Sequence, residues 1–249
     1  MHQKKSLARP GHNLSFFIAL LSLLLVAPSD AADFKLADGC LVFDYDAGSP
    51  DMKTSYSWSG ACDADGYASG KGELKAYRNG GLDEDSTGSL KRGRLEDTAV
   101  TTNLQGARFT GSYQDGMREG YGVLTGHGHG GMGFRYEGNF HHGVPEGIGV
   151  ETLADGRIYQ GSFSGNALNG QGVETGTTEQ GISFRYDGVF VQGQWSGHGL
   201  LRWSNGESAE GEFASGRMIG KGNVVRASVL QGQSASTLNL PSLILSDER

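Results

Sequence analysis

The sequence has few prolines, few cysteines and no excess of positive charge. Five prolines stand against 42 glycines in 249 residues, and the glycines show no three-residue period, which excludes a collagen-like chain. The 21 lysines and arginines are outnumbered by 28 aspartates and glutamates, so the formal net charge is −7. Because nucleic-acid binding depends on neutralising phosphates, this balance argues against nucleic acid as a partner.

Apolar residues are also scarce. They make up 37% of the chain, below the roughly 45–50% of an ordinary globular domain, so a large and conventionally packed core is not expected. The 9 tyrosines, 11 phenylalanines and 3 tryptophans speak against disorder, because disordered segments are poor in aromatic residues. Glycine and aromatic residues enriched together favour tight turns and β-sheet, and no helical period follows residue 32.

The chain has one long uncharged run, which lies near its amino end. The basic residues of segment 4–9 precede this run at 14–27, and Ser29 to Ala31 then supplies small residues at the positions that a signal peptidase reads. This pattern predicts a secretory signal peptide over residues 1–31, cleaved near Ala31, and an exported protein, periplasmic or secreted. An uncleaved anchor is the alternative, although a bilayer span needs about 20 apolar residues.

The two cysteines, Cys40 and Cys62, both follow the predicted signal peptide. An even number of cysteines in an oxidising compartment predicts a disulfide. Closing this short loop contributes on the order of 3 kcal/mol, mainly by constraining the unfolded chain. Two free thiols are the alternative.

An internal repeat dominates the rest of the chain. Its pattern is an aromatic residue, Gly two residues later and a second aromatic two further on, followed by Gly after three, four and two more residues, as in the copy from Tyr136 to Gly149. Further copies in register start at 109, 159, 186 and 209, and imperfect ones start near 58 and 86, which makes seven units over 58–222. Complete units alternate between steps of 27 and 23 residues.

Each unit is predicted to form a β-hairpin. The first, third and fifth positions point to one face of a strand. Asp115-Gly116, His142-Gly143 and Gln192-Gly193 stand where a tight turn needs positive φ. A second turn, such as Asp155-Gly156 or Asn205-Gly206, closes the short units. In the long units we expect loops four residues larger, at 126–131 and 176–181, on the same edge of the array.

The repeat resembles the MORN (membrane occupation and recognition nexus) pattern, Y-x-G-x-W-x-x-G-x-x-x-G-x-G. The head segment, with Gly39-Cys40 and Trp58-Ser59-Gly60-Ala61-Cys62, is similar to the opening of exported bacterial MORN proteins. The resemblance implies an all-β fold, an elongated single-layer antiparallel meander of stacked β-hairpins with an aromatic-lined face. The fifth position is Tyr or Phe rather than Trp, and Ala209 lacks a ring, so the last unit is a candidate cap.

The repeats are flanked by two shorter segments. Residues 32–57 form an N-terminal cap segment with the disulfide, and residues 223–249 leave the repeat pattern. Within the latter, the apolar stretch 238–245 is expected either to cover the terminal edge of the sheet or to belong to a flexible tail.

Residues that carry chemistry are few. His127 and His129 lie in a glycine-rich loop, which is a poorly preorganised metal site. The acidic run 83–85 lacks the spacing of a calcium loop. The sequence has no nucleophile elbow and no dinucleotide fingerprint. We therefore predict no catalytic residues, no metal site and no cofactor.

The remaining hypothesis is an interaction module. The sequence favours a non-catalytic scaffold that binds an unidentified protein; a module that binds glycan or envelope lipid headgroups is the alternative, and an enzyme without a familiar motif is the least favoured. A homodimer is also compatible with the repeats. Arg135 and Arg185, each within Phe-Arg-Tyr, are candidates for polar contacts. The candidate partner surface consists of the repeat rings, and the alternative is that these rings mainly hold the sheet together: Tyr113, Tyr136, Phe140, Tyr159, Phe163, Tyr186 and Phe190.

Overall fold

The computed structural model describes residues 34–44, 53–128 and 131–226, and its elements are all β-strands. In the described ranges, no helix is long and apolar enough to cross a membrane. The predicted signal peptide, His129 and residues 227–249 of the tail lie outside these ranges.

The strands follow one another along the chain, and from β5 onward two to five residues connect them. Their bounds are β1 Phe34–Ala37, β2 Cys40–Phe43, β3 Thr54–Trp58, β4 Ala61–Cys62, β5 Ala68–Arg78, β6 Gly81–Lys91, β7 Arg94–Asn103, β8 Arg108–Gln114, β9 Met117–His127, β10 Gly133–His141, β11 Val144–Leu153, β12 Ile158–Ser164, β13 Ala167–Thr177, β14 Ser183–Val191, β15 Gln194–Trp203, β16 Ser208–Ala214 and β17 Arg217–Val225.

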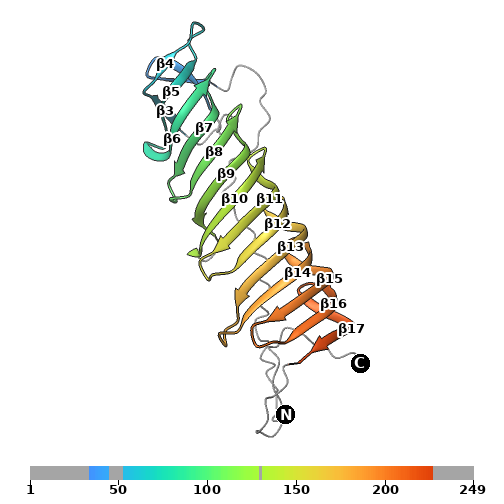
Figure 1. Ribbon diagram of the computed structural model, residues 1–249. Coiled ribbons are helices and arrows are strands. Elements are labelled where there is room, and N and C mark those ends of the chain that lie inside the picture. The colour runs from blue at the N-terminus through green and yellow to red at the C-terminus, as the bar shows by residue number, and fades with distance from the viewer. Residues whose placement is uncertain (1–33, 45–52, 129–130, 227–249) are drawn as a thin grey trace, which may run out of the picture.

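The topology is an antiparallel meander. From β5 to β17 each strand pairs with the next along the chain, β3 and β4 both pair with β5, and β1 and β2 form a separate hairpin at the head. Figure 1 shows the resulting long, twisted open sheet. The predicted fold class, an elongated single-layer meander of hairpins, is confirmed.

The hairpin turns inside the units have the predicted backbone. Both central residues have positive φ, 47° at His142 and 86° at Gly143, as a type I′ turn requires. The same holds at Asp115-Gly116 and at Gln192-Gly193. In the unit that starts at Tyr159 the glycine comes first, in Gly165-Asn166, and asparagine tolerates the left-handed conformation there.

The turns between units differ from the prediction for the long units. Leu153 N–H donates to the Arg157 carbonyl over 2.9 Å in a short unit, and Thr178 N–H donates to the Ile182 carbonyl over 2.9 Å in a long one. The turn is therefore the same, and the prediction of a larger loop is wrong. The extra residues lengthen the two arms of the hairpin instead. From the pair Glu174–Tyr186 to the bonded pair Thr178–Ile182 each arm advances four residues, whereas from Glu151–Tyr159 to Leu153–Arg157 each arm advances two. Adding two residue positions to each strand preserves which face every side chain occupies.

A row of glycines crosses the sheet at one register. Consecutive members pair across neighbouring strands, and this glycine row consists of Gly111, Gly122, Gly138, Gly149, Gly161, Gly172, Gly188, Gly199 and Gly211.

Aromatic rings lie directly on the glycine row. A β-carbon added at Gly149 would lie 2.6 Å from Cε2 of Tyr136, and one added at Gly138 would lie 2.6 Å from the Tyr136 hydroxyl oxygen. Tyr186 lies in the same way against Gly188 and Gly199. Only glycine leaves room for a ring against the backbone at these positions.

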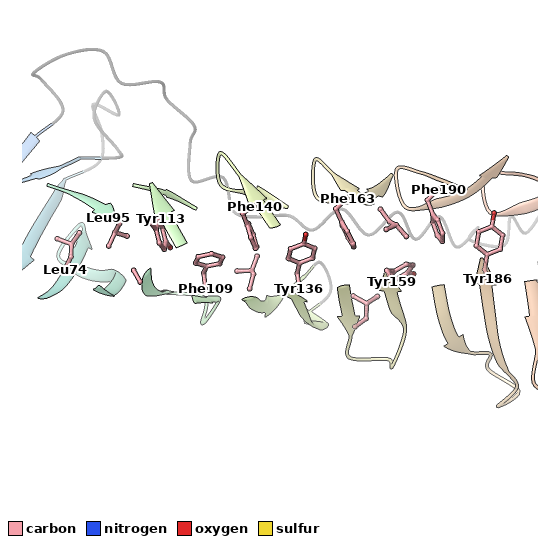
Figure 2. Packing of buried hydrophobic residues seen from close by; sticks show 14 of the residues in the cluster. Leu74, Leu95, Phe109, Tyr113, Tyr136, Phe140, Tyr159, Phe163, Tyr186 and Phe190 are labelled. Atoms are coloured by element: carbon pink, nitrogen blue, oxygen red, sulfur yellow. The ribbon is translucent and has the colours of Figure 1, made fainter. Parts of the chain in front are cut away.

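The core lies on one face of the sheet, which we call the inner face. Register shifts such as the one between Gly138 and Phe140 mark β-bulges, which bend a strand. Figure 2 shows the rings between two rows of strands, so the bent sheet supplies both sides of its own core. The rings meet edge to face, with centroids 5.2 Å apart for Tyr136 and Phe140 and 4.9 Å for Tyr136 and Phe163.

In two units, a side chain from the following strand replaces the ring on the glycine row. In the last unit, which lacks a ring at Ala209, Met218 Cε would lie 3.2 Å from a β-carbon added at Gly211. In the unit that starts at Tyr159, Leu168 covers the glycine row, and its Cδ1 would lie 3.1 Å from a β-carbon added at Gly161.

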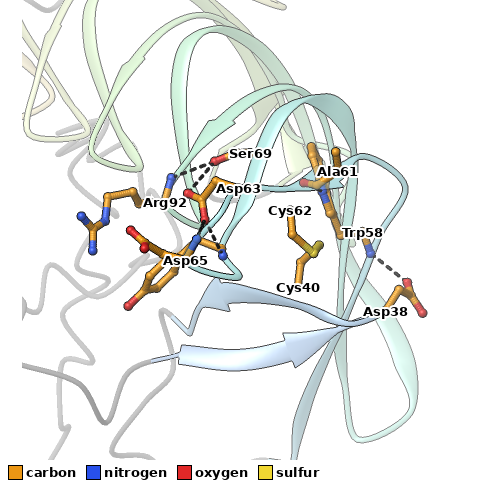
Figure 3. Close-up of a disulfide and its surroundings, with 10 residues drawn as sticks. Asp38, Cys40, Trp58, Ala61, Cys62, Asp63, Asp65, Ser69 and Arg92 are labelled. Carbon is orange, nitrogen blue, oxygen red and sulfur yellow. Dashed lines mark hydrogen bonds between the residues drawn. A yellow bond between two sulfur atoms is a disulfide. The ribbon is translucent and has the colours of Figure 1, made fainter.

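The head hairpin is tied to the main sheet. Cys40 and Cys62 form the predicted disulfide (Figure 3). Nearby, Asp38 accepts a hydrogen bond of 2.9 Å from the backbone N–H of Trp58, and the Trp58 indole donates to the Ala61 carbonyl over 3.0 Å. The disulfide and the Asp38 bond join the β1–β2 hairpin to β4 and β3.

We predict that Gly149→Ala lowers the free energy of unfolding by about 1–3 kcal/mol, because the methyl group overlaps the Tyr136 ring. Gly133→Ala is the matched control, since its nearest neighbour is the Ala154 methyl carbon at 3.8 Å. Urea unfolding of both variants measures the difference. Equal losses would show that Tyr136 does not need the glycine row.

Candidate functional site

The seven repeat rings form the core rather than an open surface. Tyr136 and Tyr186 are 0% exposed, and the most exposed of the seven, Tyr159, is only 9% exposed. The candidate partner surface must be corrected here, because bending of the sheet and ring-on-glycine packing cover these rings. The glycan alternative loses its support for the same reason, since sugar stacking needs an open ring face.

Arg135 and Arg185 occupy the opposite face, which we call the outer face. Both are exposed, and both pair with an acid two residues along the same strand: Arg135 with Glu137, and Arg185 with Asp187 through contacts of 2.8 and 2.6 Å. Exposed pairs of this kind contribute little to stability. Their role as partner contacts stays a prediction.

The outer face also exposes two apolar side chains near the middle of the array. Tyr121 on β9 is 56% exposed and Ile148 on β11 is 64% exposed. Each stands between the two glycines of a Gly-x-Gly segment. In the sheet, β10 lies between the strands of Tyr121 and Ile148. The Tyr121 hydroxyl donates a hydrogen bond to Glu137, so the ring is held beside the Arg135–Glu137 pair.

The inner face contains a polar group that sequence analysis missed. Glu151 and Glu174 are buried at the register where other strands place Leu124 and Leu201. With three neighbours they form what we call the buried acidic cluster, which consists of Glu151, Arg157, Tyr159, Glu174 and Trp195. The signal in the sequence was Val-Glu-Thr, which occurs twice where the repeat otherwise has an apolar residue.

Glu174 is fully engaged within this cluster. The Trp195 indole Nε1–H donates to Glu174 Oε2 over 2.7 Å, and the Tyr159 hydroxyl also bonds to this carboxyl group. Burial raises the pKa of Glu174, and the two hydrogen bonds counteract that rise. Trp195 in turn stacks on Tyr186 with centroids 4.5 Å apart, which ties Glu174 to the ring core.

Tyr159 takes part in this network because Leu168 occupies its place on the glycine row. Its hydroxyl accepts a hydrogen bond of 3.0 Å from Arg157, and Arg157 pairs with Asp155 at 2.8 Å. Burial is the main cause of the raised pKa of Tyr159, and the negative charge of Glu174 adds to it. A chain of polar contacts therefore runs from the β11–β12 turn to β15.

One carboxyl oxygen of Glu151 lacks such a partner. Glu151 is 6% exposed, and its buried Oε1 has no hydrogen-bond partner. Burial raises the pKa of Glu151 to about 7, although the charge of Arg157 acts in the opposite direction. A buried carboxyl group without donors favours its protonated form.

The two acids of the cluster stand on different strands. Glu151 and Glu174 lie two strands apart, which is about 9–10 Å at normal strand spacing. Two shallow hollows, of about 500 and 350 Å³, include neither residue, although Thr152, next to Glu151, lines the second. Within the described parts of the chain, no group of three or more His, Cys, Asp and Glu side chains is arranged to hold a metal ion.

Comparison with known families agrees with the repeat pattern. The MORN repeat model matches residues 109–130, 136–156, 159–179 and 186–208. No curated protein matches the chain. The four matched segments coincide with the most regular units, so these four units are similar to the MORN repeat.

We predict that Trp195→Phe lowers the free energy of unfolding by about 1–3 kcal/mol more than Trp203→Phe, because it leaves buried Glu174 without its indole donor. Trp203 is a matched control, since it is similarly buried on the inner face. Urea unfolding at pH 8 compares the two variants. Similar losses would mean that the indole bond to Glu174 does not stabilise the cluster.

Proposed function

We propose that this protein is a non-catalytic repeat scaffold that binds another protein through the outer face of its sheet. The observation that carries the proposal is the filling of the inner face by the protein's own side chains. A partner is therefore expected to contact the outer face. The MORN repeats support this role, because such repeats generally act as interaction modules without catalytic activity.

The chemistry around Tyr121 supports a protein partner. Tyrosine and arginine are enriched where proteins meet, and apolar contacts there are usually surrounded by polar ones. Tyr121 and Ile148 supply exposed apolar area, and the Arg135–Glu137 pair stands beside them. We expect the contact surface to centre on β9, β10 and β11.

Affinity capture tests the proposal. The bait is residues 32–249, and the extract is the exported fraction of the source cells. We expect a stoichiometric protein partner that is lost when Tyr121 and Ile148 are both changed to serine. The matched control changes Val191 and Ile219 to serine. These are two other exposed apolar residues of the repeat strands, and this variant is expected to retain the partner.

Circular dichroism and thermal unfolding first confirm that both double variants fold. Retention of the partner by the Tyr121/Ile148 variant would contradict the placement of the contact surface on β9, β10 and β11. Retention of the bait on peptidoglycan or on lipid vesicles, with no protein captured, would favour the glycan or lipid alternative. A self-associating bait would instead identify a second copy of this chain as the partner.

We also propose that the protein works outside the cytoplasm, because residues 1–31 have the pattern of a signal peptide and the disulfide suits an oxidising compartment. Intact mass spectrometry of the native protein tests this. We expect a mass that lacks residues 1–31 and the hydrogens of both thiols. A full-length protein with free thiols would contradict export.

A further inference from the structure

We propose that Glu151 is a proton-binding site that controls the packing of strands in the middle of the array. Strands β10, β11 and β12 stay packed while the Glu151 carboxyl group is protonated, and they loosen when it ionises. The proposal begins from geometry. Glu151 is buried on the inner face, between Tyr136 of β10 and Tyr159 of β12 at the same register.

Hydrogen-bond donors around Glu151 are engaged elsewhere. The Tyr136 hydroxyl, on the β10 side, donates to the Asn139 carbonyl over 3.1 Å. On the β12 side, Tyr159 bonds to Glu174, while Arg157 pairs with Asp155 and also donates to Tyr159. Arg157 is therefore the positive charge near Glu151, and Glu174 and Asp155 are the other acids of the network. An ionised Glu151 is left with a buried oxygen that has no donor.

Glu174 provides an internal comparison. It occupies the same register two strands away, and it receives hydrogen bonds from Trp195 and Tyr159. The two acids thus differ in their donors and not in their place in the repeat. A carboxylate with two donors is held in its site, whereas a buried carboxylate without them destabilises the packing around it.

The direction of the pH effect follows from linkage. The pKa of Glu151 rises from its ordinary value of 4.5 to about 7 in the folded protein. The stabilisation of the folded protein by protonated Glu151 is therefore fully present below about pH 4.5 and is lost as the pH rises through about 7. Between pH 5.5 and pH 8 this shift changes the opening equilibrium by about 30-fold.

The effect is expected to be local because of the repeat architecture. In the sheet, β11 pairs only with β10 and β12 among the described strands. Stability in such arrays is carried by contacts between neighbours. Weakening the packing at β11 therefore loosens the junction between the two halves of the array before it affects either half.

Hydrogen exchange measured by mass spectrometry at pH 5.5 and pH 8 tests the proposal on residues 32–249. After correction for intrinsic exchange, we expect opening of β10 to β12 to increase about 30-fold in the native sequence. In Glu151→Leu it is expected to change less than about 3-fold, because a neutral side chain has no linked proton. Leucine already occupies this register at Leu124 and Leu201.

Two further variants keep the test decisive. Glu151→Gln retains the shape of the side chain and is expected to remove the pH response even if leucine disturbs packing. Glu179→Gln removes a charge at an exposed turn and is expected to leave the response intact. The proposal is overturned if Glu151→Gln responds like the native sequence, if Glu179→Gln abolishes the response, or if exchange rises equally in all strands.

Discussion

The contact of aromatic rings with a row of glycines is the interaction on which this structure depends. An isolated flat sheet exposes both of its faces, and 37% apolar residues do not supply a second layer to cover one of them. Here Tyr136 and Tyr186 lie on backbone that has no side chains in the way. Bulges at the same register bend the strands, so that a single sheet closes over its own rings.

This packing also explains how the repeats vary without losing the fold. The site above the glycine row must be filled, but the residue that fills it changes. Met218 replaces the ring that is missing at Ala209, and Leu168 takes the place that Tyr159 leaves. The second exchange allows polar chemistry in the core, because Tyr159 then joins the buried acidic cluster.

Much of the fold was predictable because its signals are local. Turn dipeptides such as His142-Gly143 determine their own backbone, and the repeat spacing gives the order of the strands. The long units were predicted wrongly, since counting residues does not distinguish a larger loop from longer strands. The cue lay in the unchanged turn, which depends on hydrogen bonds between residues such as Thr178 and Ile182.

The site was less predictable than the fold. Burial of the rings depends on how the sheet bends across many strands, and no single unit contains that information. Arg135 and Arg185 were predicted only as candidates for polar contacts. Their place on the outer face follows from alternation along a strand, because each directly precedes a buried tyrosine. Glu151 and Glu174 were overlooked because repeats are recognised by the positions that they share. These two acids stand where other units have a leucine.

The central claim is that the repeat tyrosines are core and that Tyr121 belongs to the accessible face. Hydroxyl-radical footprinting with mass spectrometry tests this directly on the folded, unbound protein, because oxidation follows side-chain exposure. The account predicts rapid oxidation of Tyr121, which is 56% exposed, and protection of Tyr136 and Tyr186, which are 0% exposed. Oxidation of all three rings at similar rates would contradict the account, because it would mean that the inner face is open.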